Sequence, residues 1–341
     1  MALVRKILFP FAILYGLVTA LRNFLFDKGI LKSHSFDLPL IAVGNLSVGG
    51  TGKTPQIEYL IRLLSTRYRL ATLSRGYKRH SKGFVLADKT ADAMTIGDEP
   101  YQYYTKFPGI IVAVDADRKN GIQRLLSLSD KPELVLLDDA YQHRKVRAGF
   151  YILLTAYNDL YTDDYMLPTG NLRESRSGAN RADMVIVTKC PPDLSPEQRE
   201  FVRHRLGLAA GQQLYFTYIR YDDLVYSATG TKNVSDIKAE KKLLVAGIAK
   251  PAPFFEFLQQ PDDIAMPFPD HHEFTEADIA AIQNNARDRI IITTEKDYMR
   301  LSDRLPAAQL FYLPIQTAFV ADANTFDSMV SDYVERQRIR S

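Results

Sequence analysis

Six short apolar runs in the first half of the chain predict buried strands. They lie at residues 38–43, 70–73, 110–114, 134–137, 151–154 and 184–187. Most of them are continuous rather than alternating, which is typical of strands covered on both faces of a parallel sheet. The stretches between the runs suit helices, and the one at 55–66 begins with a proline, which fits a first helical turn. We therefore expect a doubly wound α/β domain with helices on both faces of a mainly parallel sheet.

The second half predicts a smaller α/β domain. A helix is expected at 196–206, and two short aromatic runs at 213–220 and 224–227 flank a turn, which predicts a β-hairpin. Further strands are predicted at 243–248, 289–293 and 309–313, followed by a charged helix at 325–338. The expected organisation is an N-terminal helix at 1–30, a core at 31–210, a hairpin linker or hinge at 211–230 and a C-terminal α/β domain at 231–341.

Composition agrees with a globular chain of about two domains. The chain has 341 residues, of which 46% are apolar and 24% charged. Its net charge of +3 is too small to indicate a nucleic-acid partner. The single cysteine, Cys190, excludes an internal disulfide, so a reducing compartment fits best.

A glycine-rich loop between the first predicted strand and the first helix predicts a phosphate site. It consists of Ser47, Val48, Gly49, Gly50, Thr51, Gly52, Lys53 and Thr54. Glycines let successive N–H groups turn toward phosphate oxygens, while the lysine reaches the β- and γ-phosphates and the hydroxyl holds Mg²⁺. The loop differs from the usual pattern because Ser47 replaces the first glycine. Its position between strand and helix favours an ATP-binding P-loop over a simple turn.

A second element supports Mg-ATP binding. The apolar run at 134–137 ends in Asp138 and Asp139, which is typical of a strand that delivers a carboxylate to Mg²⁺ or its water ligands. Two kinds of switch protein fit poorly. Pro191 stands where a GTPase would carry its guanine-reading aspartate, and Ser47 stands where a deviant-Walker ATPase would carry a lysine.

Several further motifs together resemble the tetraacyldisaccharide 4′-kinases, which phosphorylate the lipid A precursor. They are Val43-Gly44-Asn45, Ser74-Arg75-Gly76-Tyr77, Gly97-Asp98-Glu99-Pro100, Asp117-Arg118, residues 138–144, residues 170–174, residues 269–274 and Thr294-Glu295-Lys296-Asp297. The resemblance spans about residues 5–300. It departs at Ala140-Tyr141, where the family more often has Gly-Phe, and at Asn171, where the family varies.

The resemblance implies transfer of the ATP γ-phosphoryl group to the 4′-hydroxyl of a tetraacylated glucosamine disaccharide 1-phosphate. It implies that Asp98 accepts the hydroxyl proton with support from His271, and that Glu99 joins Asp138 and Asp139 near the metal. Asp98 and His271 lie in different predicted domains, so their joint action requires domain closure about the linker.

The expected substrate contacts come from polar residues beside these motifs. They are Arg118, Arg173, Gln142, His143 and Glu174. An arginine fork matches phosphate oxygens, which favours Arg118 and Arg173 for the anionic head of the substrate. The alternative for each of the five is a solvated or salt-bridged surface residue.

The N-terminus carries an apolar run at 7–21 behind Arg5 and Lys6. A secretory signal is disfavoured, because we count no apolar run of 18 residues and a P-loop needs cytosolic nucleotide. Two alternatives stay open: a helix lying on a membrane surface, or a core helix packed on its own domain. A substrate with four acyl chains favours the first, with Arg22 and Lys28 near the lipid headgroups.

The expected partners are a membrane-embedded acylated disaccharide 1-phosphate and the inner-membrane surface, with no obligate protein partner. The expected location is the cytoplasmic face of the inner membrane of a Gram-negative bacterium, peripheral or monotopic. Two other functions remain to be tested: a P-loop ATPase that regulates or recruits a membrane partner, and a soluble small-molecule kinase or ligase.

Overall fold

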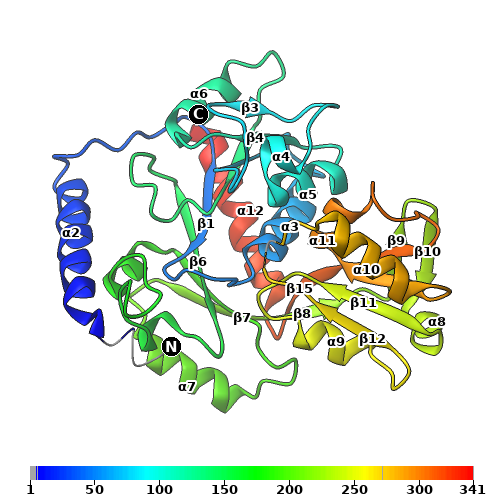
Figure 1. Ribbon diagram of the computed structural model, residues 1–341. Coiled ribbons are helices and arrows are strands. Elements are labelled where there is room, and N and C mark those ends of the chain that lie inside the picture. The colour runs from blue at the N-terminus through cyan, green and yellow to red at the C-terminus, as the bar shows by residue number, and fades with distance from the viewer. Residues whose placement is uncertain (1–4, 6, 271, 341) are drawn as a thin grey trace.

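The computed structural model describes residue 5 and residues 7–270 and 272–340. Two mixed sheets lie side by side, each with helices on both faces, and an apolar N-terminal helix stands to one side of the larger unit, beside its loops (Figure 1). This architecture confirms the predicted α/β class, with a large, mostly parallel sheet and a smaller C-terminal α/β unit.

The large sheet has the strand order β15-β8-β7-β6-β1-β5-β2-β4-β3. Its strands are β1 Leu40–Asn45, β2 Leu70–Ser74, β3 Val85–Leu86, β4 Ile111–Val114, β5 Leu134–Asp138, β6 Phe150–Ala156, β7 Met184–Thr188, β8 Gln213–Tyr221 and β15 Ile315–Phe319. All neighbouring pairs are parallel except the two at the edges, β3 with β4 and β15 with β8. The six strands predicted from continuous apolar runs are all present here.

Burial on both faces explains why these strands show no alternation. In β1, Ile41 and Val43 enter the core under one set of helices, whereas Leu40 and Ala42 enter the core on the other side. The helices of the first set are α3 Lys53–Leu64, α5 Asp98–Lys106 and α12 Ala323–Arg340. Those of the second set are α6 Arg118–Leu126 and α7 Pro196–Leu206. Short helical turns complete the unit: α4 Ala93–Ile96, η1 Tyr161–Asp163 and η2 Arg176–Arg181.

The small sheet has the order β10-β9-β14-β13-β11-β12. Its strands are β9 Leu224–Ser227, β10 Gly230–Asn233, β11 Lys242–Ala246, β12 Ile264–Pro267, β13 Ile290–Thr294 and β14 Leu310–Leu313. One face packs on α8 Val234–Ala239 and α9 Ala252–Leu258. The other face packs on α10 Glu276–Ala286 and α11 Glu295–Leu301, so the small unit has its own core.

The predicted β-hairpin linker is wrong. β8 pairs with β7 and β15 in the large sheet, whereas β9 pairs with β10 and β14 in the small one. The reason is a second crossing segment, in which β14 passes through Pro314 directly into β15. The two crossings are tied together, since Asp222 N donates to Pro314 O at 3.1 Å and Gln316 Nε2 donates to Asp222 Oδ2 at 3.0 Å. The units are therefore joined by two antiparallel segments rather than by one hairpin.

The C-terminal helix also differs from its expected place. The expected small domain ran to residue 341, but α12 buries Phe326, Val330 and Val334 in the core of the large sheet. The Tyr333 hydroxyl accepts from Leu40 N at 3.2 Å and donates to Leu40 O at 3.1 Å. The chain thus returns to the large unit after β14.

The N-terminal helix α2, Phe9–Asp27, is not a core helix. Only 11% of its most apolar window is buried, and its length and mean hydropathy of 1.5 are sufficient to cross a membrane. That finding corrects our expectation that no run of such length is present. Large apolar side chains are exposed along it, namely Phe9, Phe11, Ile13, Leu14, Tyr15, Leu17, Val18, Leu21 and Phe24.

Replacing Phe326 tests the assignment of α12 to the large core. We expect Phe326→Ala to lower the free energy of unfolding by about 3–5 kcal/mol, because it leaves a cavity among fully buried neighbours. Phe201→Ala on α7 is the control, since Phe201 is 64% exposed, and should change it by less than about 1 kcal/mol. Urea denaturation measures both; similar values for the two variants would contradict the assignment.

Candidate active site

The glycine-rich loop is held by side chains from β1 and α3. Gly49 and Gly52 adopt φ of +119° and +84°, backbone conformations that favour glycine. Asn45, at the end of β1, donates from Nδ2 to Ser47 O at 2.6 Å and accepts from Lys53 Nζ at 3.2 Å. The loop therefore has the strand–loop–helix form that predicted a P-loop, with Lys53 as the first residue of α3.

The other side of the loop rests on the end of β7. Thr188 Oγ1 donates to Thr51 O at 2.7 Å, and Lys189 Nζ donates to Gly50 O at 2.6 Å. Thr188 and Lys189 occupy the position at which a GTPase would bind guanine, but here they hydrogen-bond to the phosphate loop.

Asp138 lies beside the P-loop because β5 pairs with β1, which sets Asp138 opposite Val43. Burial and then the charge of Asp139 raise the pKa of Asp138 to about 7. Among the described residues its Oδ1 has no hydrogen-bond partner, while the Tyr103 hydroxyl lies 3.4 Å from its Oδ2. A cation bound beside such a buried carboxylate would stabilise its ionised form.

The residues around Asp138 fit a magnesium ion held partly by nucleotide and water. No group of three or more His, Cys, Asp or Glu side chains gathers as a metal site within the part of the chain that the structure describes. Mg²⁺ takes few protein ligands in nucleotide sites, so a sparse set is suitable. Tyr103 lies close to the Thr54 side chain as well as to Asp138, which places two of the four predicted metal ligands around one phenol. The charge of Glu99 also acts on Asp138.

Asp139 is engaged differently from its neighbour. Arg173 clamps it with two hydrogen bonds, from NH1 to Oδ2 at 3.1 Å and from NH2 to Oδ1 at 2.8 Å, and Lys53 Nζ lies 3.7 Å from Oδ1. Partial burial favours the neutral acid, but Lys53 and Arg173 overcome it and lower the pKa of Asp139 to about 2. Asp139 thus orients the P-loop lysine in this structure rather than facing an open metal site.

Three of the predicted substrate residues meet at the end of β1. Arg173 NH2 donates to Asn45 Oδ1 at 2.6 Å, and Gln142 Nε2 donates to Asn45 O at 2.9 Å and to Glu174 Oε1 at 2.8 Å. Glu174 is buried and also accepts from Arg181 through both oxygens at 2.9 Å. Arg173, Gln142 and Glu174 therefore form one network with the P-loop.

Arg118 and His143 have other surroundings. Arg118 is 1% exposed and donates to the carbonyl oxygens of Asp115 and Asp138 at 2.6 and 3.1 Å, so it supports the ends of two strands. Burial and then the charges of Arg118, Arg75 and Arg22 lower the pKa of His143 to about 4. The field at His143 is therefore positive and attracts anions.

The N-terminal helix touches this network directly. Tyr15 donates to Arg173 O at 3.0 Å, Arg22 to Gln142 O at 3.1 Å, and Asn23 to Glu174 Oε2 at 3.0 Å. The exposed apolar helix is thus fixed to the loops that carry the predicted substrate residues.

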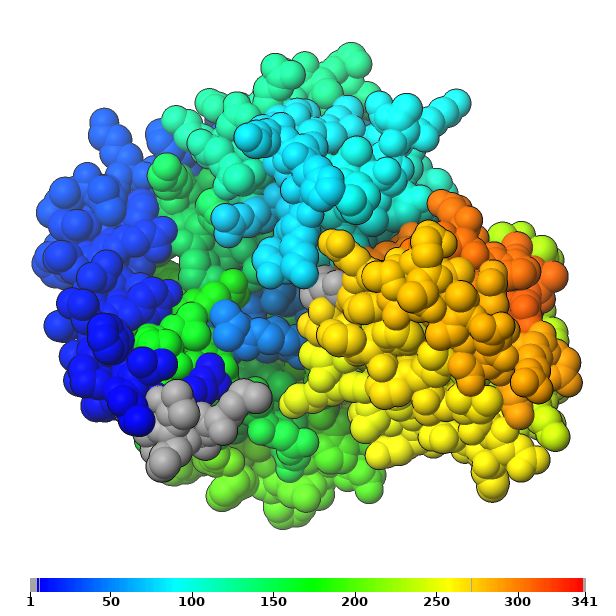
Figure 2. All heavy atoms as spheres, in the orientation of Figure 1, coloured from blue at the N-terminus to red at the C-terminus, as the bar shows by residue number. Residues whose placement is uncertain are grey.

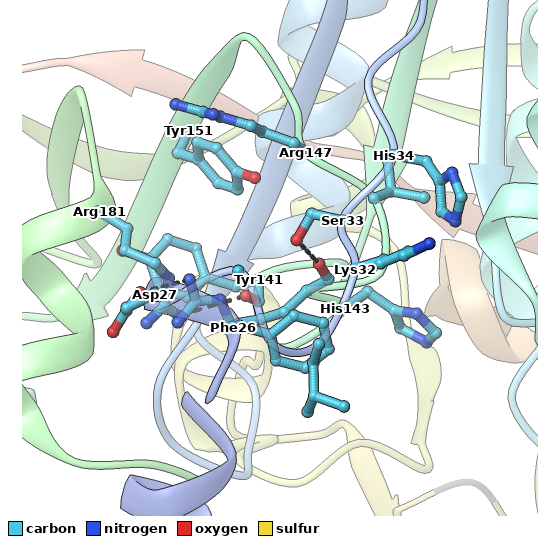
Figure 3. Close-up of a pocket in the computed structure, with 14 residues that line it drawn as sticks. Phe26, Asp27, Lys32, Ser33, His34, Tyr141, His143, Arg147, Tyr151 and Arg181 are labelled. Carbon is cyan, nitrogen blue, oxygen red and sulfur yellow. Dashed lines mark hydrogen bonds and ion pairs between the residues drawn. The ribbon is translucent and has the colours of Figure 1, made fainter. Parts of the chain in front are cut away.

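A cavity of 720 Å³ opens where α2 ends, against the loop that follows β5 (Figure 3). Its walls carry more cationic than acidic side chains, with Lys32, Arg144, Arg147 and Arg181 around Asp27. His143 also lines it, so the cavity adjoins the positive side of the site.

Asp98 begins α5 and lies 7% exposed at the junction of the two units. Arg300 of α11 pairs with it through two hydrogen bonds, from Nε to Oδ1 at 3.0 Å and from NH2 to Oδ2 at 2.5 Å. His271, its predicted partner, lies outside the described residues, so the Asp98–His271 dyad stays a prediction. The neighbouring His272 pairs with Asp278, with 2.9 Å between Nε2 and Oδ2.

Buried charges join the P-loop helix, α5 and the small unit. Lys106 Nζ lies 2.8 Å from Glu58 Oε2 of α3 and 2.7 Å from Glu295 Oε1 of α11. Burial and then the charge of Glu58 raise the pKa of Glu295 to about 7. Breaking such a buried group by removing one partner is costly, so the cluster keeps α5 docked on the small unit.

Sequence reasoning missed four residues of the site: Asn45, Tyr103, Arg300 and Asn23. Asn45 could have been found because it belongs to the motif Val43-Gly44-Asn45. Arg300 could have been found because it follows Lys296 by four residues, a spacing that puts both side chains on one face of a helix. Thr294 and Asp297 have structural tasks: Thr294 caps α11, and Asp297 accepts from Gly247 N at 2.8 Å.

The parallel sheet, the phosphate loop and the acidic end of β5 define a P-loop nucleotide-binding protein equipped for phosphoryl transfer. In the space-filling view, the P-loop segment reaches the surface between the N-terminal helix and the small unit (Figure 2). Residues 4–335 match the family model described as tetraacyldisaccharide-1-P 4′-kinase, and the chain belongs to this family.

Individual relatives agree with this assignment. A tetraacyldisaccharide 4′-kinase of Flavobacterium johnsoniae is 64% identical over 335 residues, covering 98% of each chain. One from Bacteroides fragilis is 50% identical, covering 87% of this chain and 83% of its own. The crystal structure of the Aquifex aeolicus kinase LpxK in complex with ATP superposes with a TM-score of 0.78 at 29% identity, covering 97% of this chain and 99% of that one. The resemblance found in the sequence is confirmed.

The raised pKa of Asp138 predicts a pH-dependent stability difference. Between about pH 4 and 7 the folded, nucleotide-free protein binds a proton at Asp138 that the unfolded chain releases, so the stability contributed there falls as the pH rises. Asp138→Asn removes the ionisable group and with it this fall in stability. We expect the variant to gain stability relative to wild type across that window, reaching about 2–4 kcal/mol above pH 7.

Urea denaturation at pH 4 to 8 without nucleotide measures the difference. Glu295 titrates in both proteins, so its contribution cancels from the difference in stability between the variant and wild type. A difference that is constant with pH would contradict the assignment of the titration to Asp138.

Proposed function

We propose that this chain transfers the γ-phosphoryl group of ATP to the 4′-hydroxyl of tetraacyldisaccharide 1-phosphate, giving the bisphosphorylated lipid A precursor. The observation that carries the proposal is the direct attachment of an exposed apolar helix to a P-loop site: Tyr15, Arg22 and Asn23 of α2 bond to the loops that hold Arg173, Gln142 and Glu174. A lipid substrate needs such a site, and a soluble one does not. Family membership supports the identity of the acceptor.

In this proposal, Ser47 to Thr54 bind the triphosphate and Lys53 neutralises charge on the transferred group. The ATP complex of the Aquifex protein supports the choice of nucleotide. Thr54 and Asp138 would hold Mg²⁺, with Glu99 close by, and the ion would supply positive charge to the phosphate oxygens. Arg173 holds Asp139 against Lys53 and so keeps the lysine aimed at the phosphates.

Asp98 accepts the proton of the 4′-hydroxyl as the hydroxyl oxygen bonds to the γ-phosphorus of ATP, and the bond from that phosphorus to the bridging oxygen breaks so that ADP leaves. His271 assists Asp98. The two crossing segments between the units act as the hinge that brings the segment around His271 to the substrate. Arg118 acts by supporting the strand ends, while Arg173, Gln142, His143 and Glu174 position the anionic, hydroxyl-rich head. The positive field at His143 supports this role.

In this proposal the enzyme works on the cytoplasmic face of the inner membrane of a Gram-negative bacterium, as a peripheral or monotopic protein, and the exposed apolar face of α2 supports this location. Its exposed side chains enter the lipid, and the acyl chains of the substrate need not leave the bilayer.

Lys53→Met tests the phosphate site. We expect this variant to form bisphosphorylated lipid at least about 100-fold more slowly than wild type, because it loses a cation aimed at the transferred group. Product is measured by mass spectrometry after incubation with Mg-ATP and tetraacyldisaccharide 1-phosphate in mixed micelles. Lys131→Met, on the exposed loop before β5 and at the opposite end of that strand from Asp138, is the control and should keep wild-type activity. ATP hydrolysis by wild type without lipid product would favour a regulatory ATPase and overturn the proposal.

The combined variant Leu14→Ser, Leu17→Ser and Leu21→Ser tests the membrane contact. These side chains are 60%, 63% and 59% exposed and repeat at helical spacing, so together they present one apolar surface. We expect partition into lipid vesicles to fall at least about tenfold, with ATP affinity unchanged. Phe201→Ser, an exposed apolar change on α7, should leave partition unchanged. Equal partition of the triple variant and wild type would contradict the proposed contact.

A further inference from the structure

Three basic side chains of the small unit, spaced four residues apart in the sequence, bind one neighbouring segment. Lys296 Nζ lies 3.2 Å from Asp270 Oδ1, Arg300 NH1 donates to His272 O at 2.6 Å, and Arg304 NH1 donates to Phe274 O. Residues 296 and 300 lie in α11, and residue 304 lies in the turn that follows it. The segment that contains position 271 in the sequence is therefore anchored on α11 from both sides of that position.

Arg300 also makes contacts between the two units. Its Nε and NH2 donate to the two oxygens of Asp98 at 3.0 and 2.5 Å, and the Asp98 side chain is almost fully buried. Arg304 makes its contacts within the small unit, to Phe274 O and to Glu276. One guanidinium thus connects the predicted base to the backbone of the residue that follows His271 in the sequence.

We propose that Arg300 is the positioning residue that orients Asp98 for proton transfer and couples it to the segment around His271. The inference rests on the proposed function, in which Asp98 takes the hydroxyl proton. A guanidinium fork fixes the plane of a carboxylate, and its charge favours the ionised form that a base requires. Each carboxylate oxygen has two lone pairs, and the fork uses one on each oxygen.

The position of Arg300 also makes this orientation depend on the docked arrangement of the two units. Arg300 belongs to α11 and Asp98 to α5, so the fork exists only when these helices are in contact. The separate Glu58–Lys106–Glu295 cluster joins the same helices. Removal of the Arg300 side chain therefore leaves another group of buried charges to keep the units docked.

Matched variants separate this role from simple anchoring of the segment. Arg300→Gln removes both the fork and its charge, Arg300→Lys keeps the charge without the fork, and Arg304→Gln loosens the same segment without touching Asp98. The kcat and the KM values for Mg-ATP and tetraacyldisaccharide 1-phosphate are measured for each variant and wild type in mixed micelles, with urea denaturation as a check of folding.

We expect Arg300→Gln to lower kcat about 100-fold, the cost of a misplaced reacting group, with both KM values within about threefold of wild type. Arg300→Lys should recover part of this loss, and Arg304→Gln should keep kcat within about threefold. Wild-type kcat in Arg300→Gln, or equal losses in Arg300→Gln and Arg304→Gln, would overturn the inference alone. Absence of bisphosphorylated product from wild type would overturn the proposed function and the inference with it.

Discussion

The site depends on the parallel pairing of β1 with β5, which brings two adjacent carboxylates against the P-loop lysine. Lys53 and Arg173 balance the charge of Asp139 and lower its pKa, whereas Asp138 is buried with a raised pKa. The nucleotide-free protein therefore keeps a destabilising carboxylate beside the Thr54 end of α3. A bound cation would relieve that cost, so the same feature that weakens the empty fold would favour binding of the metal and nucleotide.

Two other parts of the molecule, α2 and the small unit, also contact this site. On one side, α2 binds the loops of Arg173 and Glu174 while exposing its apolar surface, so membrane contact and substrate position are set by the same helix. On the other side, Glu295 and Arg300 of the small unit pair with Lys106 and Asp98 of α5, and Lys106 also pairs with Glu58 of α3. The proposed lipid, nucleotide and proton-accepting functions thus meet where three separate parts of the chain converge.

Sequence patterns predicted the inner strands of both sheets, because their apolar runs reflect burial, but missed the edge strands β3, β10, β12 and β15. They predicted the P-loop because the loop is one short, continuous motif. Pairing partners were less visible: the two aromatic runs read as a hairpin, since local spacing does not show that β14 and β15 cross beside them. A helix pattern likewise does not reveal which core it covers, as α12 demonstrates. Asn45, Tyr103 and Arg300 were missed because their roles come from tertiary contacts, and the burial of Arg118 arises only when the strand ends meet.

The proposed reaction phosphorylates one particular hydroxyl of a membrane lipid. The most direct measurement is phosphorus–proton correlation NMR of the lipid produced from tetraacyldisaccharide 1-phosphate and Mg-ATP. We expect a new phosphomonoester coupled to the proton at the 4′ carbon, with the 1-phosphate unchanged. A phosphate at another hydroxyl, or ATP consumption with the lipid unaltered, would contradict it.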